Sequence, residues 1–180
     1  METLVENIRK NGVPDTWSDT MKMQASLNLK QKGYRKKVTW KQSVVPGANI
    51  GIFAAEDIRK GEVIRVLEEN KNLIVFRSKN DIPPLTPTTK DFLSNYICQS
   101  EDLCLVMIPG TSFNHSEEKV NMKMVKISEH VVHIVARRDI TCGDEIFEDY
   151  NDSGSPPDFL AETVREHGMS LIFKGFNDFV

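Results

Sequence analysis

Two short stretches decide the fold of this chain: FNHSEEKVN at residues 113–121 and ITCGDEIFEDYN at residues 140–151. The first brings together Asn114, His115 and Ser116, whose side chains can hydrogen-bond to nearby backbone or to a bound ligand. The second carries four acidic residues shortly before Tyr150. Taken singly, each stretch has an ordinary explanation. A lone histidine is usually a structural hydrogen-bonding residue, and clustered acids usually form a solvated strand edge or a cation site.

A third stretch, NIGIFAAEDIRKGEVI at residues 49–64, precedes both. Asn49 and Gly51 both tolerate a left-handed backbone, so this loop can bring bare backbone close to a ligand before it enters a strand. An ordinary hairpin turn is the simpler interpretation of this stretch alone.

Around these stretches, short β-branched runs alternate with turn residues, as is typical of strands. We expect strands at residues 38–45, 50–54, 63–68 and 73–76. We expect hairpins joining 96–99 to 103–108 and 121–127 to 131–136. Helices are predicted at 89–95 and at 157–167, the latter ending at Gly168, while prolines keep 79–89 irregular. The predicted fold class is mainly β, with several small twisted sheets. The glycine fingerprint of a doubly wound βαβ fold is missing.

The two ends of the chain differ in pattern from the middle. Residues 1–35 are predicted to form a helical extension, because apolar residues recur every four positions and Gly33 is a plausible stop. Residues 36–152 form the main domain, and residues 153–180 form a helix and an aromatic tail. The recurring apolar residues are Trp17, Met21, Ala25 and Leu29, and the tail aromatics are Phe159, Phe173, Phe176 and Phe179.

Composition excludes several classes of protein. The 180 residues carry a formal net charge of −3, which leaves no global nucleic-acid footprint. The six basic residues between Lys30 and Lys41 favour a solvated linker over nucleic-acid contact. Three scattered cysteines argue against a disulfide framework and a zinc site. We expect no membrane span and no secretory signal, and therefore a protein of the nucleus or cytoplasm.

In their order and separation, the three stretches resemble the SET-domain protein lysine methyltransferases. NIGIFAAEDIRKGEVI resembles the family's GxG turn followed by an aromatic residue, a strand and I-x-K-G-E. FNHSEEKVN resembles the NHS-x-x-PN element, and ITCGDEIFEDYN resembles the element that ends at the catalytic tyrosine. NYICQSEDLCLVMIPGTSFNHS, at residues 95–116, is similar to the paired strands that precede NHS in small single-domain members. The likeness covers residues 36–152, and no cysteine-rich zinc segment follows Tyr150.

The resemblance implies a SET fold in which the chain around Asn114 and the segment ending at Tyr150 cross in a pseudoknot-like arrangement. It implies S-adenosyl-L-methionine as cofactor and a protein lysine, most often of a histone tail, as methyl acceptor. Tyr150 is the implied catalytic residue. The implied cofactor-binding residues are Asn49, Ile50, Gly51, Ile52, Phe53, Asn114, His115 and Tyr150. The implied substrate channel contains Tyr96, Phe113 and Glu148, and no metal is expected.

Three departures from the family pattern keep alternatives open. Asn49 replaces the first glycine, Val120 replaces a proline, and Glu148 stands where an aromatic or aliphatic residue is usual. A carboxylate there could attract the substrate ammonium or could point away, so the number of methyl groups added is not specified. One alternative is a SET module that binds chromatin or another protein without turnover. Another is a metal-dependent hydrolase using His115 with the acids at 144–149. A homodimer formed through the amino-terminal helix also stays open.

Overall fold

The computed structural model describes residues 4–13, 33–48, 50–100, 103–107, 113–152 and 157–169. The elements in chain order are α1 (Leu4–Asn11), β1 (Val38–Gln42), β2 (Ile50–Ala54), β3 (Val63–Glu68), β4 (Leu73–Phe76), the 3₁₀ turn η1 (Lys79–Asp81), α3 (Pro87–Tyr96), β5 (Ile97–Ser100), β6 (Leu103–Met107), β7 (Asn114–His115), β8 (Met122–Ser128), β9 (Val131–Ala136), β10 (Phe147–Glu148) and α4 (Asp158–His167). Within these ranges, every helix is too short or too polar to cross a membrane.

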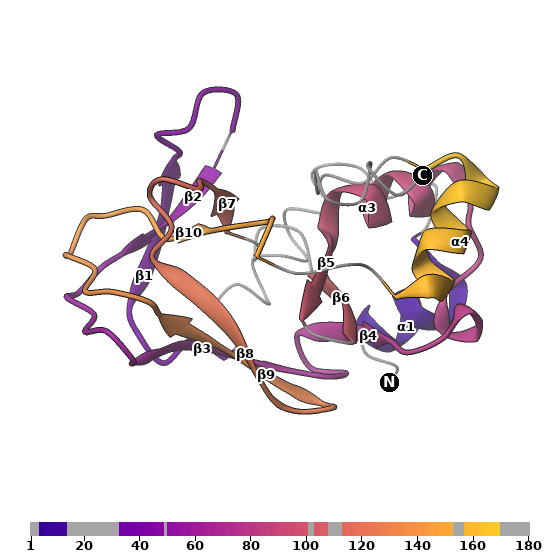
Figure 1. The fold of residues 1–180 in the computed structure, drawn as a ribbon, viewed down its shortest axis with the longest axis horizontal. Helices are drawn as coiled ribbons and strands as arrows, with labels where there is room; N and C mark the ends of the chain where they lie inside the picture. The colour runs from indigo at the N-terminus through magenta and orange to yellow at the C-terminus, as the bar shows by residue number, and fades with distance from the viewer. Residues whose placement is uncertain are drawn as a thin grey trace.

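The described strands form four small sheets. β3–β9–β8 and β4–β6–β5 are three-stranded and antiparallel, β1 pairs antiparallel with β2, and β7 pairs parallel with β10. Figure 1 shows β4–β6–β5 beside the helices at one end of the molecule and the remaining sheets at the other. The prediction of a mainly β fold with several small sheets is confirmed.

Within the described residues the predicted strands, hairpins and helices are present, and two boundaries differ from the prediction. β1 ends at Gln42 instead of residue 45, because Val44 turns out of the strand and donates its backbone N–H to Glu145. α3 begins at Pro87, two residues earlier than expected, since proline is tolerated in the first turn of a helix. Both predicted hairpins are formed. α4 ends at Gly168, whose left-handed φ of 58° closes the helix.

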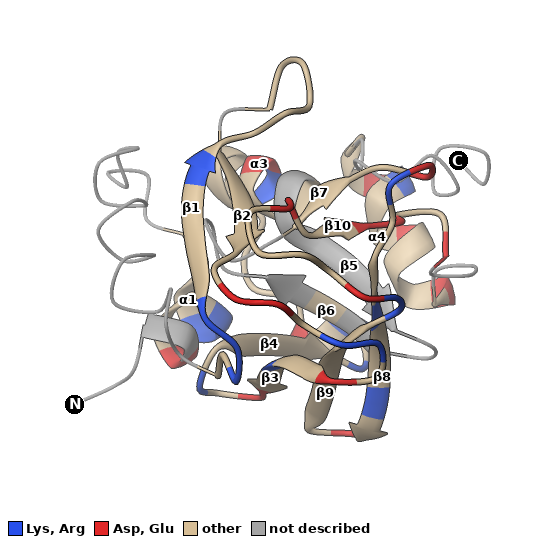
Figure 2. Ribbon diagram, turned by 90° about the vertical axis from the view of Figure 1, so that its left-hand side faces the viewer, with Lys and Arg blue, Asp and Glu red and all other residues tan. Residues whose placement is uncertain are grey.

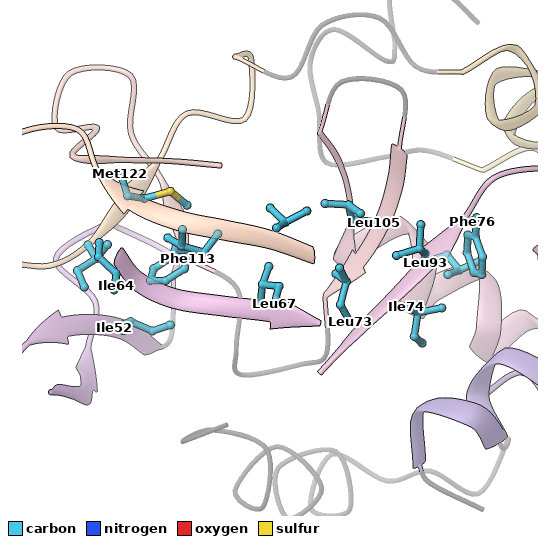
Figure 3. Packing of buried hydrophobic residues seen from close by; sticks show 14 of the residues in the cluster. Ile52, Ile64, Leu67, Leu73, Ile74, Phe76, Leu93, Leu105, Phe113 and Met122 are labelled. Atoms are coloured by element: carbon cyan, nitrogen blue, oxygen red, sulfur yellow. The ribbon is translucent and has the colours of Figure 1, made fainter. Parts of the chain in front are cut away.

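One hydrophobic core connects the sheets at the two ends (Figure 3). Ile64 and Leu67 of β3 are both 0% exposed and connect the interior on the β1–β2 side with the interior under β4. The labelled side chains around them in Figure 3 are Ile52, Leu73, Ile74, Phe76, Leu93, Leu105, Phe113 and Met122. This core holds the backbone on which the polar site is built.

The amino-terminal residues that the structure describes share this core. Ile8 of α1 and Val13 are each 2% exposed, and the Val13 N–H donates to the Thr89 hydroxyl at 3.0 Å. The predicted helix preceding Gly33 lies outside the described residues. So do Phe173, Phe176 and Phe179, whereas Phe159 packs partly buried against the core.

Candidate active site

The stretches FNHSEEKVN (113–121) and ITCGDEIFEDYN (140–151) lie side by side in space. β7 and β10 pair in parallel, with Asn114 opposite Phe147 and His115 opposite Glu148. The Ser116 N–H donates to the Glu148 carbonyl at 3.0 Å, which extends the pairing beyond the strands. Two segments about thirty residues apart in sequence therefore meet as the crossing that the resemblance implied (Figure 1).

The side chain of Asn121 holds the second stretch, residues 140–151, through two hydrogen bonds. Its side-chain amide donates to the Glu145 carbonyl at 2.9 Å, and its side-chain oxygen accepts the Phe147 N–H at 2.8 Å. Asn121 is 4% exposed, so both bonds are made away from water. The side chain imitates a neighbouring strand and fixes the backbone that leads to Tyr150.

The buried carboxylate of Glu145 organises the other side of the crossing. Glu145 is 4% exposed and accepts hydrogen bonds from the Ser43 hydroxyl at 2.8 Å, the Val44 N–H at 2.9 Å and the Asn114 amide at 2.8 Å. These three donors satisfy a charge that would otherwise be costly to bury. A Cβ at Gly51 would overlap this carboxylate, so Gly51 is required for close packing here. Sequence reasoning had attributed Gly51 to a left-handed turn, but its φ is not positive.

Asn114 uses its side chain to join three segments of the protein. Its amide lies 3.0 Å from the Ser43 hydroxyl, 3.0 Å from the Ile50 carbonyl and 2.8 Å from Glu145. The start of β2 is thereby attached to β7. The sequence did not identify Ser43 as a site residue and indicated Glu145 only as one of the acids of a metal site, because nothing local marks a side chain whose partners are distant in the chain.

The β2 segment that was predicted to bind the cofactor is exposed at only one end. Ile50 is 49% exposed, whereas Ile52 and Phe53 are 2% and 6% exposed. The Ile52 carbonyl already accepts the Ile146 N–H at 2.7 Å. Asn49 lies outside the described residues. Of residues 50–53, Ile50 is therefore the one whose surface is exposed.

Tyr150 lies against the first stretch. Its hydroxyl donates to the Phe113 carbonyl at 2.7 Å, and its N–H donates to Nδ1 of His115 at 3.1 Å. The two rings stack with centroids 5.0 Å apart. Because Nδ1 accepts this hydrogen bond, the neutral imidazole carries its proton on Nε2. Phe113 is 1% exposed, so the carbonyl that fixes the phenol belongs to a tightly packed residue.

Glu148 is the other buried acid of the second stretch. It is 7% exposed, and burial together with the neighbouring Asp149 charge raises its pKa to about 8. Within the described part of the chain its carboxyl group makes no hydrogen bond or ion pair. Of the remaining predicted channel residues, Phe113 reaches the crossing, while Tyr96 ends α3 and its side chain lies outside what the structure describes.

His115 and Glu145 are engaged in hydrogen bonds within the protein, whereas a metal-dependent hydrolase would need such side chains as metal ligands. Nδ1 of His115 is occupied by a backbone N–H, and the Glu145 oxygens are occupied by three donors. Among the described residues, no group of three His, Cys, Asp or Glu side chains could hold a metal ion.

The described part of the basic run contacts the protein itself. Figure 2 shows basic residues just before β1 and at its end. Lys36 forms an ion pair with Glu62 at 2.7 Å, and the Lys41 ammonium lies 5.2 Å from the centre of the Phe53 ring.

Comparison with protein families matches residues 49–151 to the SET domain, more than half of the chain. The chain therefore belongs to the SET-domain family, as the motifs had indicated. Comparison with curated protein sequences finds no match.

Solved structures share the fold at low sequence identity. The Chaetomium thermophilum Polycomb Repressive Complex 2 bound to GSK126 has a TM-score of 0.54 and 22% identity over 72% of this chain and 17% of that chain. The structure of ctPRC2 in an autoinhibited conformation bound to S-adenosylmethionine has a TM-score of 0.50 and 22% identity over 74% of this chain and 17% of that chain. CpSET8 from Cryptosporidium has a TM-score of 0.48 and 18% identity over 83% of this chain and 74% of that chain. This chain thus spans less than a fifth of the Polycomb chains that it matches.

Proposed function

We propose that this protein transfers a methyl group from S-adenosyl-L-methionine to a lysine side chain of a protein, with a histone tail as the favoured substrate. The observation that carries the proposal is the β7–β10 crossing, which seats Tyr150 against the Phe113 carbonyl and the His115 ring. Membership of the SET family and a structural neighbour bound to S-adenosylmethionine support the choice of cofactor.

The residues around the start of β2 fit this cofactor, which has apolar and charged parts. Val44 and Ile50 are 57% and 49% exposed, so the loop between β1 and β2 presents apolar side chains beside Asn114. We assign the cofactor to the segment from Asn49 to Phe53, with its main contact near Ile50, and to Asn114 and His115. When bound, it supplies an electrophilic methyl group.

The chain's contribution to methyl transfer is alignment and exclusion of water. Because the Tyr150 hydroxyl donates its hydrogen to the Phe113 carbonyl, its oxygen can act toward a substrate only as an acceptor. Such an acceptor can orient an amine or stabilise polarised methyl hydrogens. The buried Phe113 and Phe147 keep this end of the crossing dry. Tyr150 therefore acts by positioning, and it does not need to be a strong base.

The substrate protein decides where the protein acts. A histone substrate requires action in the nucleus, whereas a ribosomal or other cytosolic substrate requires action in the cytoplasm. The proposed site is equally compatible with either compartment, because its chemistry requires only an exposed lysine on the substrate protein.

Tritiated-methyl transfer to mixed histones, peptide arrays and lysate proteins tests the proposal. We expect Tyr150→Phe to lose at least about 100-fold in turnover while cofactor affinity, measured by calorimetry, is retained. Tyr34→Phe is the matched control, because this tyrosine packs on Arg65 away from the crossing and its removal should leave turnover intact. Cofactor binding without methyl incorporation into any protein would instead identify a non-catalytic binding module.

A further inference from the structure

Residues 33–37, the described part of the basic run that precedes β1, are fixed against β3. The Arg35 N–H donates to the Ile64 carbonyl at 2.8 Å, and the Val66 N–H donates to the Gly33 carbonyl at 2.8 Å. Backbone that is hydrogen-bonded in this way presents its side chains in a fixed arrangement. The sequence had favoured a solvated linker here, but this part of the run is a rigid edge of the domain.

A pocket of about 270 Å³ lies beside this segment. The residues that line it are Tyr34, Lys36, Lys37, Val38 and Trp40. The rings of Tyr34 and Trp40 have their centres 6.0 Å apart and stand at 87° to each other, so the pocket has two aromatic walls at right angles. The guanidinium of Arg65, which is 0% exposed, lies 4.7 Å from the centre of the Tyr34 ring and places a buried positive charge behind that wall.

The charges beside the pocket favour a negatively charged ligand (Figure 2). Arg35 and Lys37 are both exposed to solvent. Lys36 forms its ion pair with Glu62 at 2.7 Å. The Glu56 carboxylate accepts the backbone N–H of Lys37 at 2.9 Å. Both acids are therefore bound by the segment itself, while two of its cations point to solvent next to the aromatic walls, where they attract an anion.

We propose that this pocket binds an unpaired nucleotide of a single-stranded nucleic acid. A base is a flat ring that can stack on an aromatic wall, and the phosphates on either side of it can meet Arg35 and Lys37. The volume of about 270 Å³ lies just below the ~300 Å³ at which pockets for drug-sized ligands begin, which suits one nucleotide. Acidic side chains of a peptide would supply charge but no flat ring, and a duplex keeps its bases stacked on one another.

The fluorescence of Trp40 reports binding directly, without cofactor or methyl acceptor. The chain has two tryptophans, so Trp17→Phe leaves the emission of Trp40 alone. A thymidine strand of about ten nucleotides should quench this emission, because a base stacks on the indole. Oligo-glutamate of equal charge should leave it unchanged, and a duplex should quench it far less. Equal quenching by oligo-glutamate would overturn the proposal in favour of an acidic-peptide surface.

Two variants test the base and the phosphate separately, with anisotropy of a labelled strand as the measurement. Trp40→Leu should weaken binding about 10-fold or more, the effect of one lost base stack. Lys37→Gln should weaken binding and make the slope of log K against log salt shallower by about 0.7. Lys79→Gln is the matched control, because Lys79 pairs with Glu166 of α4 at the other end of the molecule from β1 (Figure 1). It should leave the affinity and the slope unchanged.

Circular dichroism melting curves establish that each variant is folded. Because Lys37 is exposed, Lys37→Gln still decides the matter if Trp40→Leu fails to fold. Unchanged affinity in Lys37→Gln, or an equal loss in Lys79→Gln, would refute the site. A loss in Lys37→Gln with none in a folded Trp40→Leu would show charge attraction without stacking and would also refute the nucleotide pocket. Failure of methyl transfer would refute the proposed function alone, because strand binding is measured without S-adenosylmethionine.

Discussion

Asn121→Ala should lower the free energy of unfolding more than any surface substitution does, because the Asn121 side chain hydrogen-bonds to two buried backbone groups. Its removal leaves the Glu145 carbonyl and the Phe147 N–H without partners. Each unpaired buried group costs about 1–3 kcal/mol, so the free energy of unfolding should fall by about 4 kcal/mol. A typical domain has a total of only about 5–15 kcal/mol.

Urea unfolding followed by circular dichroism measures this change, with the m-value expected to stay constant. Asn151→Ala is the matched control: its amide bonds to Glu117 at 2.7 Å but is exposed, so the loss should stay within about 0.5 kcal/mol. If the two variants were equally stable, Asn121 would not be the clamp that orders the segment before Tyr150, and the reasoning would fail.

Two further predictions test the packing around the crossing and the charge network at the other end. Gly51→Ala places a Cβ into the Glu145 carboxylate and should cost about 1–3 kcal/mol, visible as a lower melting temperature; an unchanged melting temperature would contradict the contact. Glu69 accepts one hydrogen bond from each terminal nitrogen of the Arg77 guanidinium, Nη1 and Nη2, which lowers the Glu69 pKa to about 2. The contribution of Glu69 to stability is therefore complete above pH ~4.3 and is lost as pH falls toward 2. The free energy of unfolding of the wild type should exceed that of Glu69→Gln by on the order of 2 kcal/mol at neutral pH, and this difference should shrink in acid. A difference that urea titrations find to be independent of pH would refute this.

Local patterns predicted the strands and helices well, because alternation and turn residues act over a few positions. The end of β1 was wrong by three residues, since Val44 is drawn toward a carboxylate about a hundred residues away. The early start of α3 was not predicted, because three prolines indicated an irregular segment. Pro87 itself is nevertheless well suited to the first turn of a helix.

The sequence identified some residues of the candidate site but not the contacts that they make. Asn114, His115 and Tyr150 were identified from their order along the chain, and the structure brings them together. Whether Asn114 faces a ligand or the protein could not be read from sequence. Its amide turns inward to the Ile50 carbonyl and the Glu145 carboxylate, so the side chain bonds within the protein.

The order of the motifs along the chain was enough to predict the family. FNHSEEKVN and ITCGDEIFEDYN are short local sequences, so they can be recognised without knowing the fold. Only the tertiary structure decided which acid is paired and which is not. Glu145 finds Ser43, 102 residues away, and Asn114, 31 residues away, while Glu148 is buried with no donor in reach among the described residues. The physical reason is that a carboxylate's charge state depends on donors brought by distant segments, and no stretch of nine residues contains them.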